Sequence, residues 1–155
     1  MGRIYTAVFE GVAVTAQQDF FAVQCTASVP VRLISCRIGQ SSDAGDAQDE
    51  MLRIRIQRGM TSDGSGGGTV TPRPVDVLVG GTAASTVRIN DTTPASGGTI
   101  HVLLADVFNV RAGWIYMPVP EERIVCAVST RIAIGLLTTP ADSLTMSGAL
   151  AFEEI

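Results

Sequence analysis

The chain has 155 residues, of which 46% are hydrophobic and only 17% are charged. This length suits one domain with an ordinary core, so we expect a single domain over residues 1–155. The charged fraction lies below the roughly 25% usual for soluble domains. This shortage favours a subunit that covers part of its surface with copies of itself or a partner, over a solitary enzyme. The net charge of -4 and the scattered arginines argue against nucleic acid as the main partner.

The composition also excludes several chemistries. All 11 basic residues are arginine, so a Schiff-base lysine and a P-loop lysine are impossible within this chain. The cysteines Cys25, Cys36 and Cys126 form no CxxC pair and lie in apolar runs, which predicts buried, reduced thiols. The first residues do not resemble a signal peptide, and no apolar run approaches the ~18 residues of a membrane span. We therefore expect synthesis in a reducing cytoplasm and no membrane partner.

The first half of the chain predicts extended segments. Residues 4–14 are rich in Val, Phe, Tyr and Thr and read as a strand, with residues 1–10 a possible extended arm that crosses onto a neighbour. Residues 20–27 form the next strand, and residues 31–39, apolar on both faces, predict a central strand. The clearest alternation follows in residues 52–58. There Leu52, Ile54 and Ile56 share one face and Arg53, Arg55 and Gln57 the other, which predicts a half-buried strand.

The second half contains loops and more strands. The Gly, Ser, Thr and Pro content of residues 59–74 predicts a long, mobile loop. The further predicted extended segments are residues 75–79, 86–89, 99–108 (a core strand), 114–119 (an edge, because of Pro118 and Pro120), 124–128, 132–137 and 144–153. No helical periodicity persists over eleven residues. About eight to ten short strands predict an all-β, antiparallel β-sandwich, and the long crossings favour a jelly-roll or Greek-key arrangement.

No catalytic or cofactor-binding constellation emerges. His101 is the only histidine, and its apolar strand favours a hydrogen-bonded structural imidazole. Ser65 lies between Gly64 and Gly66, but Asp63 occupies the position where a nucleophile elbow needs glycine. One histidine and three scattered cysteines do not form a zinc site. Thr69 stands where GxGxxG needs its third glycine, so we expect no enzyme, no cofactor and no small-molecule substrate.

One acidic cluster leaves an alternative open. Asp43, Asp46, Asp49 and Glu50 are spaced by three residues or fewer, which is not the alternating ligand pattern of an EF-hand. A solvated acidic loop, or the cap and first turn of a short helix, is favoured over a Ca²⁺ site. If Ca²⁺ did bind, chelation would lower the melting temperature.

Some residues are better candidates for partner contacts. Arg53 and Arg55 project at regular spacing from a strand, as is suitable for charged pairing with a neighbouring subunit, and reversing both to Glu is expected to impair assembly. Trp114 and Tyr116 lie beside prolines at a predicted edge, which makes them candidates for a contact patch. The alternative interpretation is that they are ordinary core aromatics. The predicted interface comprises Arg3, Tyr5, Arg53, Arg55, Arg73, Trp114 and Tyr116.

Several segments together resemble small virion proteins of tailed bacteriophages, of the head decoration (cement) type. These are GRIY at residues 2–5, IGQSSDAGDAQDEMLRIRIQRG at residues 38–59, SGGG at residues 65–68, NVRAGW at residues 109–114 and PADSLTMSG at residues 140–148. The resemblance spans most of the chain and carries no catalytic residue.

The resemblance implies a compact β fold, often a homotrimer, that binds the major capsid protein on the capsid surface of the virion after synthesis in the bacterial cytoplasm. It implies a passive mechanism, in which binding only the expanded shell stabilises that shell. The alternatives are a phage tail or receptor-binding β module, a small β-sandwich hydrolase that depends on His101, and a cellular carbohydrate-binding module. The shortage of aromatic residues disfavours the last of these.

Overall fold

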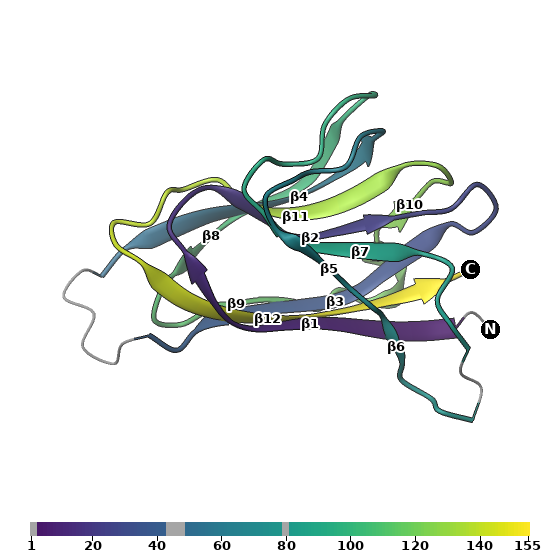
Figure 1. Ribbon diagram of the computed structural model, residues 1–155, viewed down its shortest axis with the longest axis horizontal. Helices are drawn as coiled ribbons and strands as arrows, with labels where there is room; N and C mark the ends of the chain where they lie inside the picture. Colours follow the sequence, from purple (N-terminus) through teal and green to yellow (C-terminus); the bar gives the residue numbers. More distant parts are fainter. Residues whose placement is uncertain (1–2, 43–48, 79–80) are drawn as a thin grey trace.

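The computed structural model describes residues 3–42, 49–78 and 81–155. It contains two antiparallel sheets that pack face to face (Figure 1). The predicted all-β sandwich is confirmed, while the jelly-roll arrangement stays a prediction. The described part of the chain contains one short 3-10 helix, η1 (Pro120–Glu122), and no α-helix.

The first sheet, sheet A, has the strand order β10-β3-β12-β1-β6, and β9 also pairs with β3. Its strands are β1 (Arg3–Val14), β3 (Val31–Gln40), β6 (Arg73–Pro74), β9 (Trp114–Tyr116), β10 (Val125–Cys126) and β12 (Leu144–Glu154). The last strand in the sequence, β12, therefore lies between β1 and β3 near the middle of the sheet.

The second sheet, sheet B, has the order β5-β7-β2-β11-β4-β8. Its strands are β2 (Gln18–Gln24), β4 (Met51–Met60), β5 (Gly68–Val70), β7 (Thr86–Asp91), β8 (His101–Asn109) and β11 (Arg131–Leu136). Consequently β5 and β8 are the two edge strands of this sheet.

The core lies between the sheets and follows from the two-residue alternation. On β4 the apolar residues Leu52, Ile54 and Ile56 are fully buried, as their spacing predicts. Phe9 of sheet A stacks on Phe20 of sheet B with ring centroids 6.0 Å apart, which joins the two inner faces. The cysteines Cys25, Cys36 and Cys126 are buried and unpaired in this core, as expected.

The predicted N-terminal arm is instead part of the core sheet from Arg3 onward. β1 pairs with β12 along its length, from Arg3 opposite Glu154 to Val14 opposite Leu144. Tyr5 is completely buried and its ring lies 5.9 Å from that of Phe152, so it is not an exposed interface residue. The apolar side chains at every second position of β1 explain this, because they need an opposing sheet to cover them.

The predicted long loop over residues 59–74 also differs from the structure. Gly59 lies inside β4 with φ of +97°, and residues 68–70 and 73–74 form β5 and β6. The glycines between them permit close packing, since a Cβ at Gly67 would overlap the carbonyl oxygen of Ile89. In this part of the chain the glycines therefore allow the backbone to pack closely against sheet B, where the sequence predicted a mobile loop.

The predicted core strand at residues 99–108 corresponds to β8, which lies at the edge of sheet B. Val102, Leu103 and Val107 are 51%, 41% and 49% exposed. His101 is exposed at the start of this strand, which does not fit the predicted structural imidazole. A continuous apolar run does not distinguish a buried strand from an apolar edge, and this is why the prediction failed.

Candidate interface

The outer side of sheet A carries the side chains that alternate with the core residues. Cross-strand pairs form two adjacent rows across it. One row joins Arg73, Thr6, Ala151 and Ser35. The other row joins Val8, Ala149, Arg37 and Ile115. We call this surface the open face and define it by these eight residues.

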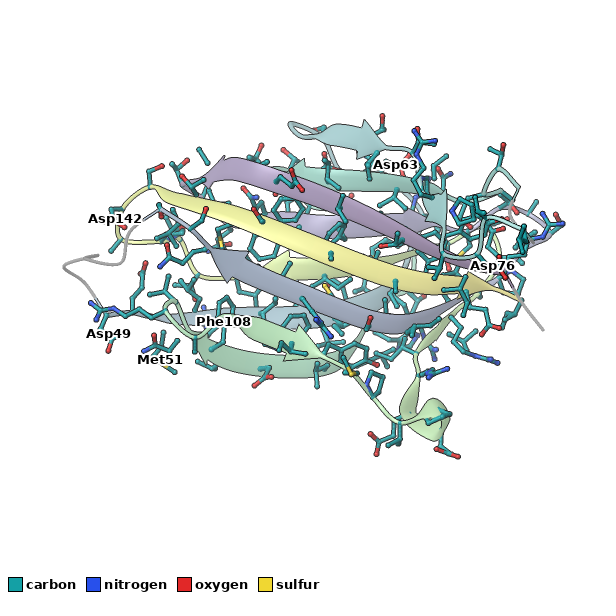
Figure 2. The ribbon with its side chains drawn as sticks, turned by 90° about the horizontal axis from the view of Figure 1, so that it is seen from below. Asp49, Met51, Asp63, Asp76, Phe108 and Asp142 are labelled. Atoms are coloured by element: carbon teal, nitrogen blue, oxygen red, sulfur yellow. The ribbon has the colours of Figure 1, made fainter. Side chains whose placement is uncertain are left out.

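Small side chains occupy the middle of the open face. Ala149 and Ala151 lie on β12, with Thr6 and Ser35 as neighbours, so the centre is shallow and weakly polar. Larger apolar side chains stand nearer the margins, where Val8 is 46% and Ile115 is 66% exposed. No element of the described chain lies over this side of β1, β12 and β3, and Figure 2 views it from below. An uncovered apolar surface of this kind is typical of a protein contact.

Charged residues lie around this centre. Arg32 and Glu153 form an ion pair of 3.1 Å at one end of the sheet. Arg37 and Arg73 are both exposed on the open face itself. Charges at the rim and small or apolar groups inside it are the usual arrangement of a protein interface.

A groove of about 490 Å³ occupies one end of the open face. Its walls include Val8, Arg37, Ile115 and Ala149 from the two strand rows, with Gly39 and Gly148 adding little side-chain bulk. The turn at residues 111–113 closes one side. The groove is therefore apolar in the main, with the guanidinium groups of Arg37 and Arg111 and the carboxylate of Glu10 at its walls.

Part of the outer side of sheet B is covered, in contrast. Residues 61–67 and 92–98, which we call the cap, pair through bridges between Ser62 and Ser96 and between Ser65 and Thr93. The cap is tied to the sheet by the ion pair of Arg131 with Asp63 at 2.7 Å. A small apolar cluster beneath it comprises Ala22, Met60, Ala95 and Ala133. The glycine-rich residues 61–67 thus pack within the protein, against residues 92–98 and sheet B.

Asp19 anchors the other side of the cap. Its carboxylate accepts a hydrogen bond of 2.8 Å from the backbone N–H of Ala95, and it lies opposite Asp91 in the β2–β7 ladder. Burial raises the pKa of Asp19 to about 6; the Ala95 hydrogen bond lowers it and the nearby Asp91 carboxylate raises it. Arg88 binds both oxygens of Asp91 at 2.7 Å. These hydrogen bonds and the Arg88–Asp91 ion pair hold the cap against the sheet.

The structure separates the predicted interface residues. Arg73 lies on the open face, and Arg3 is exposed at the start of β1. Arg53 and Arg55 lie on β4, on the outer side of sheet B and next to the edge strand β8. As contacts with a partner, these four arginines stay predictions.

The two aromatic candidates point toward the core side of β9. Trp114 is 4% exposed and its Nε1 donates a hydrogen bond of 3.0 Å to Asp106. Tyr116 is partly buried and stacks on Trp114 with centroids 6.2 Å apart. Trp114 is therefore better described as a core residue than as part of a contact patch. Between them, Ile115 is the exposed residue that the sequence pattern had not singled out.

Sequence reasoning also missed the small residues of β12. A usable signal was present, because one parity of residues 144–153 contains Thr145, Ser147, Ala149, Ala151 and Glu153. A solvent-exposed parity in a central strand ordinarily carries more charge than this. The opposite parity, with Leu144, Met146, Leu150 and Phe152, is buried, as the alternation predicts.

The remaining candidates for chemistry, which are the acidic and cysteine side chains, do not gather into one site in the described chain. Among the described residues no group of three or more His, Cys, Asp or Glu side chains could hold a metal ion. Of the predicted acidic cluster, Asp43 and Asp46 fall outside the described residues. Asp49 accepts a hydrogen bond of 2.6 Å from Asn109, and Glu50 accepts one of 3.0 Å from Ala141.

Burial raises the pKa of the Cys36 thiol, and hydrogen bonding to Cys126 together with burial raises that of Cys25.

Comparisons with known proteins add no family. No protein-family model matches the chain, and its sequence has no significant match among curated proteins. In the part of the chain that the structure describes, no helix has the length and apolar character needed to cross a membrane.

Proposed function

We propose that this protein is a non-enzymatic virion subunit that binds the major capsid protein and stabilises the shell, as a head decoration protein. The open face supports the binding part of this proposal, because it is an uncovered sheet surface with small residues at its centre. The virion part is supported by the resemblance of the quoted segments to phage decoration proteins.

The open face suits contact with a rigid surface. Its side chains stand on strands β1, β12 and β3, which pair with one another along most of their length. Small residues such as Ala149 and Ala151 lose little side-chain entropy when they are buried, so ordering them at a contact costs little. A subunit that binds only the assembled shell then stabilises it by mass action.

The apolar edge strand β8 offers a second surface on the other sheet. Val107 and Ala105 of β8 pair with Arg53 and Arg55 of β4, so an apolar strip lies beside two guanidinium groups. Two separate contact surfaces are what a subunit needs to join neighbouring capsomers.

Capsids that lack this protein provide the test. Purified protein should co-sediment with such capsids and raise their melting temperature. Ala151→Arg places a long charged side chain at the centre of the open face and should abolish both effects. Ala27→Arg, a matched change in the exposed bend between β2 and β3 and outside both contact surfaces, should retain binding. If the unaltered protein neither binds nor changes capsid melting, the proposal fails.

A further inference from the structure

Among the described residues, the two most exposed large apolar side chains, Val77 and Leu78, lie on a short projection that follows β6. Val77 and Leu78 are 83% and 92% exposed, and Val75 is 63% exposed. We call residues 75–78 the knob. Isolated apolar side chains are common on protein surfaces, but three within four residues form a compact apolar tip that lacks a covering surface in the described chain.

The described knob has a defined local shape. The backbone N–H of Val75 donates a hydrogen bond of 3.0 Å to the carbonyl oxygen of Ile4, which fixes the base of the knob to β1. The side chain of Asp76 accepts a hydrogen bond of 2.9 Å from the backbone N–H of Leu78, which stabilises the turn. Less ordering is therefore required when the tip binds.

The groove on the open face has the complementary properties. Its volume of about 490 Å³ exceeds the roughly 150 Å³ apolar cavity that accommodates a benzene-sized group. Apolar side chains of Val8 and Ile115 line it. It can thus receive the side chains of Val77 and Leu78 together.

The charges of the two surfaces are also complementary. Asp76 stands within the knob and is exposed. Arg37, also exposed, lines the groove opposite. An exposed pair of opposite charge beside an apolar contact fixes its orientation and increases the rate of association.

The knob and the groove lie at opposite ends of the molecule, so the knob of one chain cannot reach the groove of the same chain. Figure 2 shows Asp76 at one end of the long axis and Asp49 at the other. Asp49 lies 4.0 Å from Arg111, a residue of the groove wall. We propose that the knob of one copy occupies the groove of a second copy, in a head-to-tail contact that repeats from copy to copy.

Purified protein without capsids tests this contact by analytical ultracentrifugation, independently of the proposed capsid function. The unaltered protein should associate as its concentration rises. Leu78→Asp in the knob and Ile115→Asp in the groove should each stay monomeric. Val119→Asp, a change at another exposed apolar position outside both surfaces, should associate as the unaltered protein does.

A mixture of the two monomeric variants distinguishes this contact from a symmetric one. The intact knob of Ile115→Asp can enter the intact groove of Leu78→Asp, so an equimolar mixture should form a species of two chains and nothing larger. A mixture that stays monomeric, an unaltered protein that stays monomeric, or Leu78→Asp protein that still associates would each overturn the proposal. Capsid binding without self-association would leave the proposed function intact and remove this inference alone.

A charge exchange gives a second test. Asp76→Arg and Arg37→Asp should each weaken self-association at least tenfold, and the chain that carries both changes should recover most of the loss. Additive losses in the double variant would show that the two side chains do not meet, and would contradict the proposed geometry.

Discussion

Asp19 shows how one side chain can make the cap sensitive to pH. Its carboxyl is 3% exposed, and its pKa rises from 3.8 to about 6 in the folded protein. The folded state therefore binds a proton more tightly than the unfolded chain does. The contribution of Asp19 to stability is greatest below pH 4 and falls as the pH rises through 6.

The corresponding prediction concerns Asp19→Asn. A change of about two pKa units corresponds to roughly 3 kcal/mol, at about 1.4 kcal/mol per unit. The unfolding free energy of the unaltered protein should fall by up to this amount between pH 4 and pH 7 relative to Asp19→Asn, whose amide oxygen can still accept the Ala95 hydrogen bond. Urea unfolding at several pH values measures the difference. Parallel pH profiles for the two proteins would contradict the assigned role of Asp19.

At the scale of single strands, β4 supplies the most regular part of the core. Ile54 is fully buried between neighbours on β11 and β8, opposite Leu136 and Asp106. Ile54→Ala should lower the unfolding free energy by about 2–5 kcal/mol, because it removes buried methyl groups and leaves a cavity. Denaturant unfolding measures this. A loss below about 1 kcal/mol would mean that the sheets move together to fill the space.

The arginines of the same strand lead to a prediction about assembly. Arg53→Glu with Arg55→Glu reverses two charges beside β8 and should weaken binding to capsids roughly tenfold or more. Arg55 also lowers the pKa of Asp19, so Arg53→Glu alone is the cleaner change. Co-sedimentation measures binding, and circular dichroism checks the fold. Unchanged binding would mean that these arginines are only solvated.

The sequence predicts strands better than it predicts their neighbours. The alternation in β4 and β12 identifies both the strand and its buried face, since period-two patterns report which side meets the core. It does not report which strand lies beside it, so β8 was expected in the core and the first residues were expected in an arm. The cap depends on contacts such as Asp19 with Ala95, which are 76 residues apart and leave no local pattern.

At the scale of the whole molecule, the two outer surfaces differ in kind. The outer side of sheet B is covered in part by the cap, which the ion pair of Arg131 with Asp63 ties to the sheet. The open face of sheet A has no such cover in the described chain. The low charge of the sequence predicts a covered surface of some kind, but composition cannot locate it. The arrangement of β1, β12 and β3 shows an uncovered sheet surface in the described chain, and this is where we propose that the contact lies.

The position of β12 also affects how the protein folds during synthesis. This strand follows every other described strand in the sequence, yet it separates β1 from β3 in sheet A and pairs with both. A ribosome must therefore synthesise the chain through residue 154 before β1 acquires its main partner. Until then the apolar side of β1, including Tyr5 and Phe9, awaits cover, and this interval is when binding by a chaperone would be most useful.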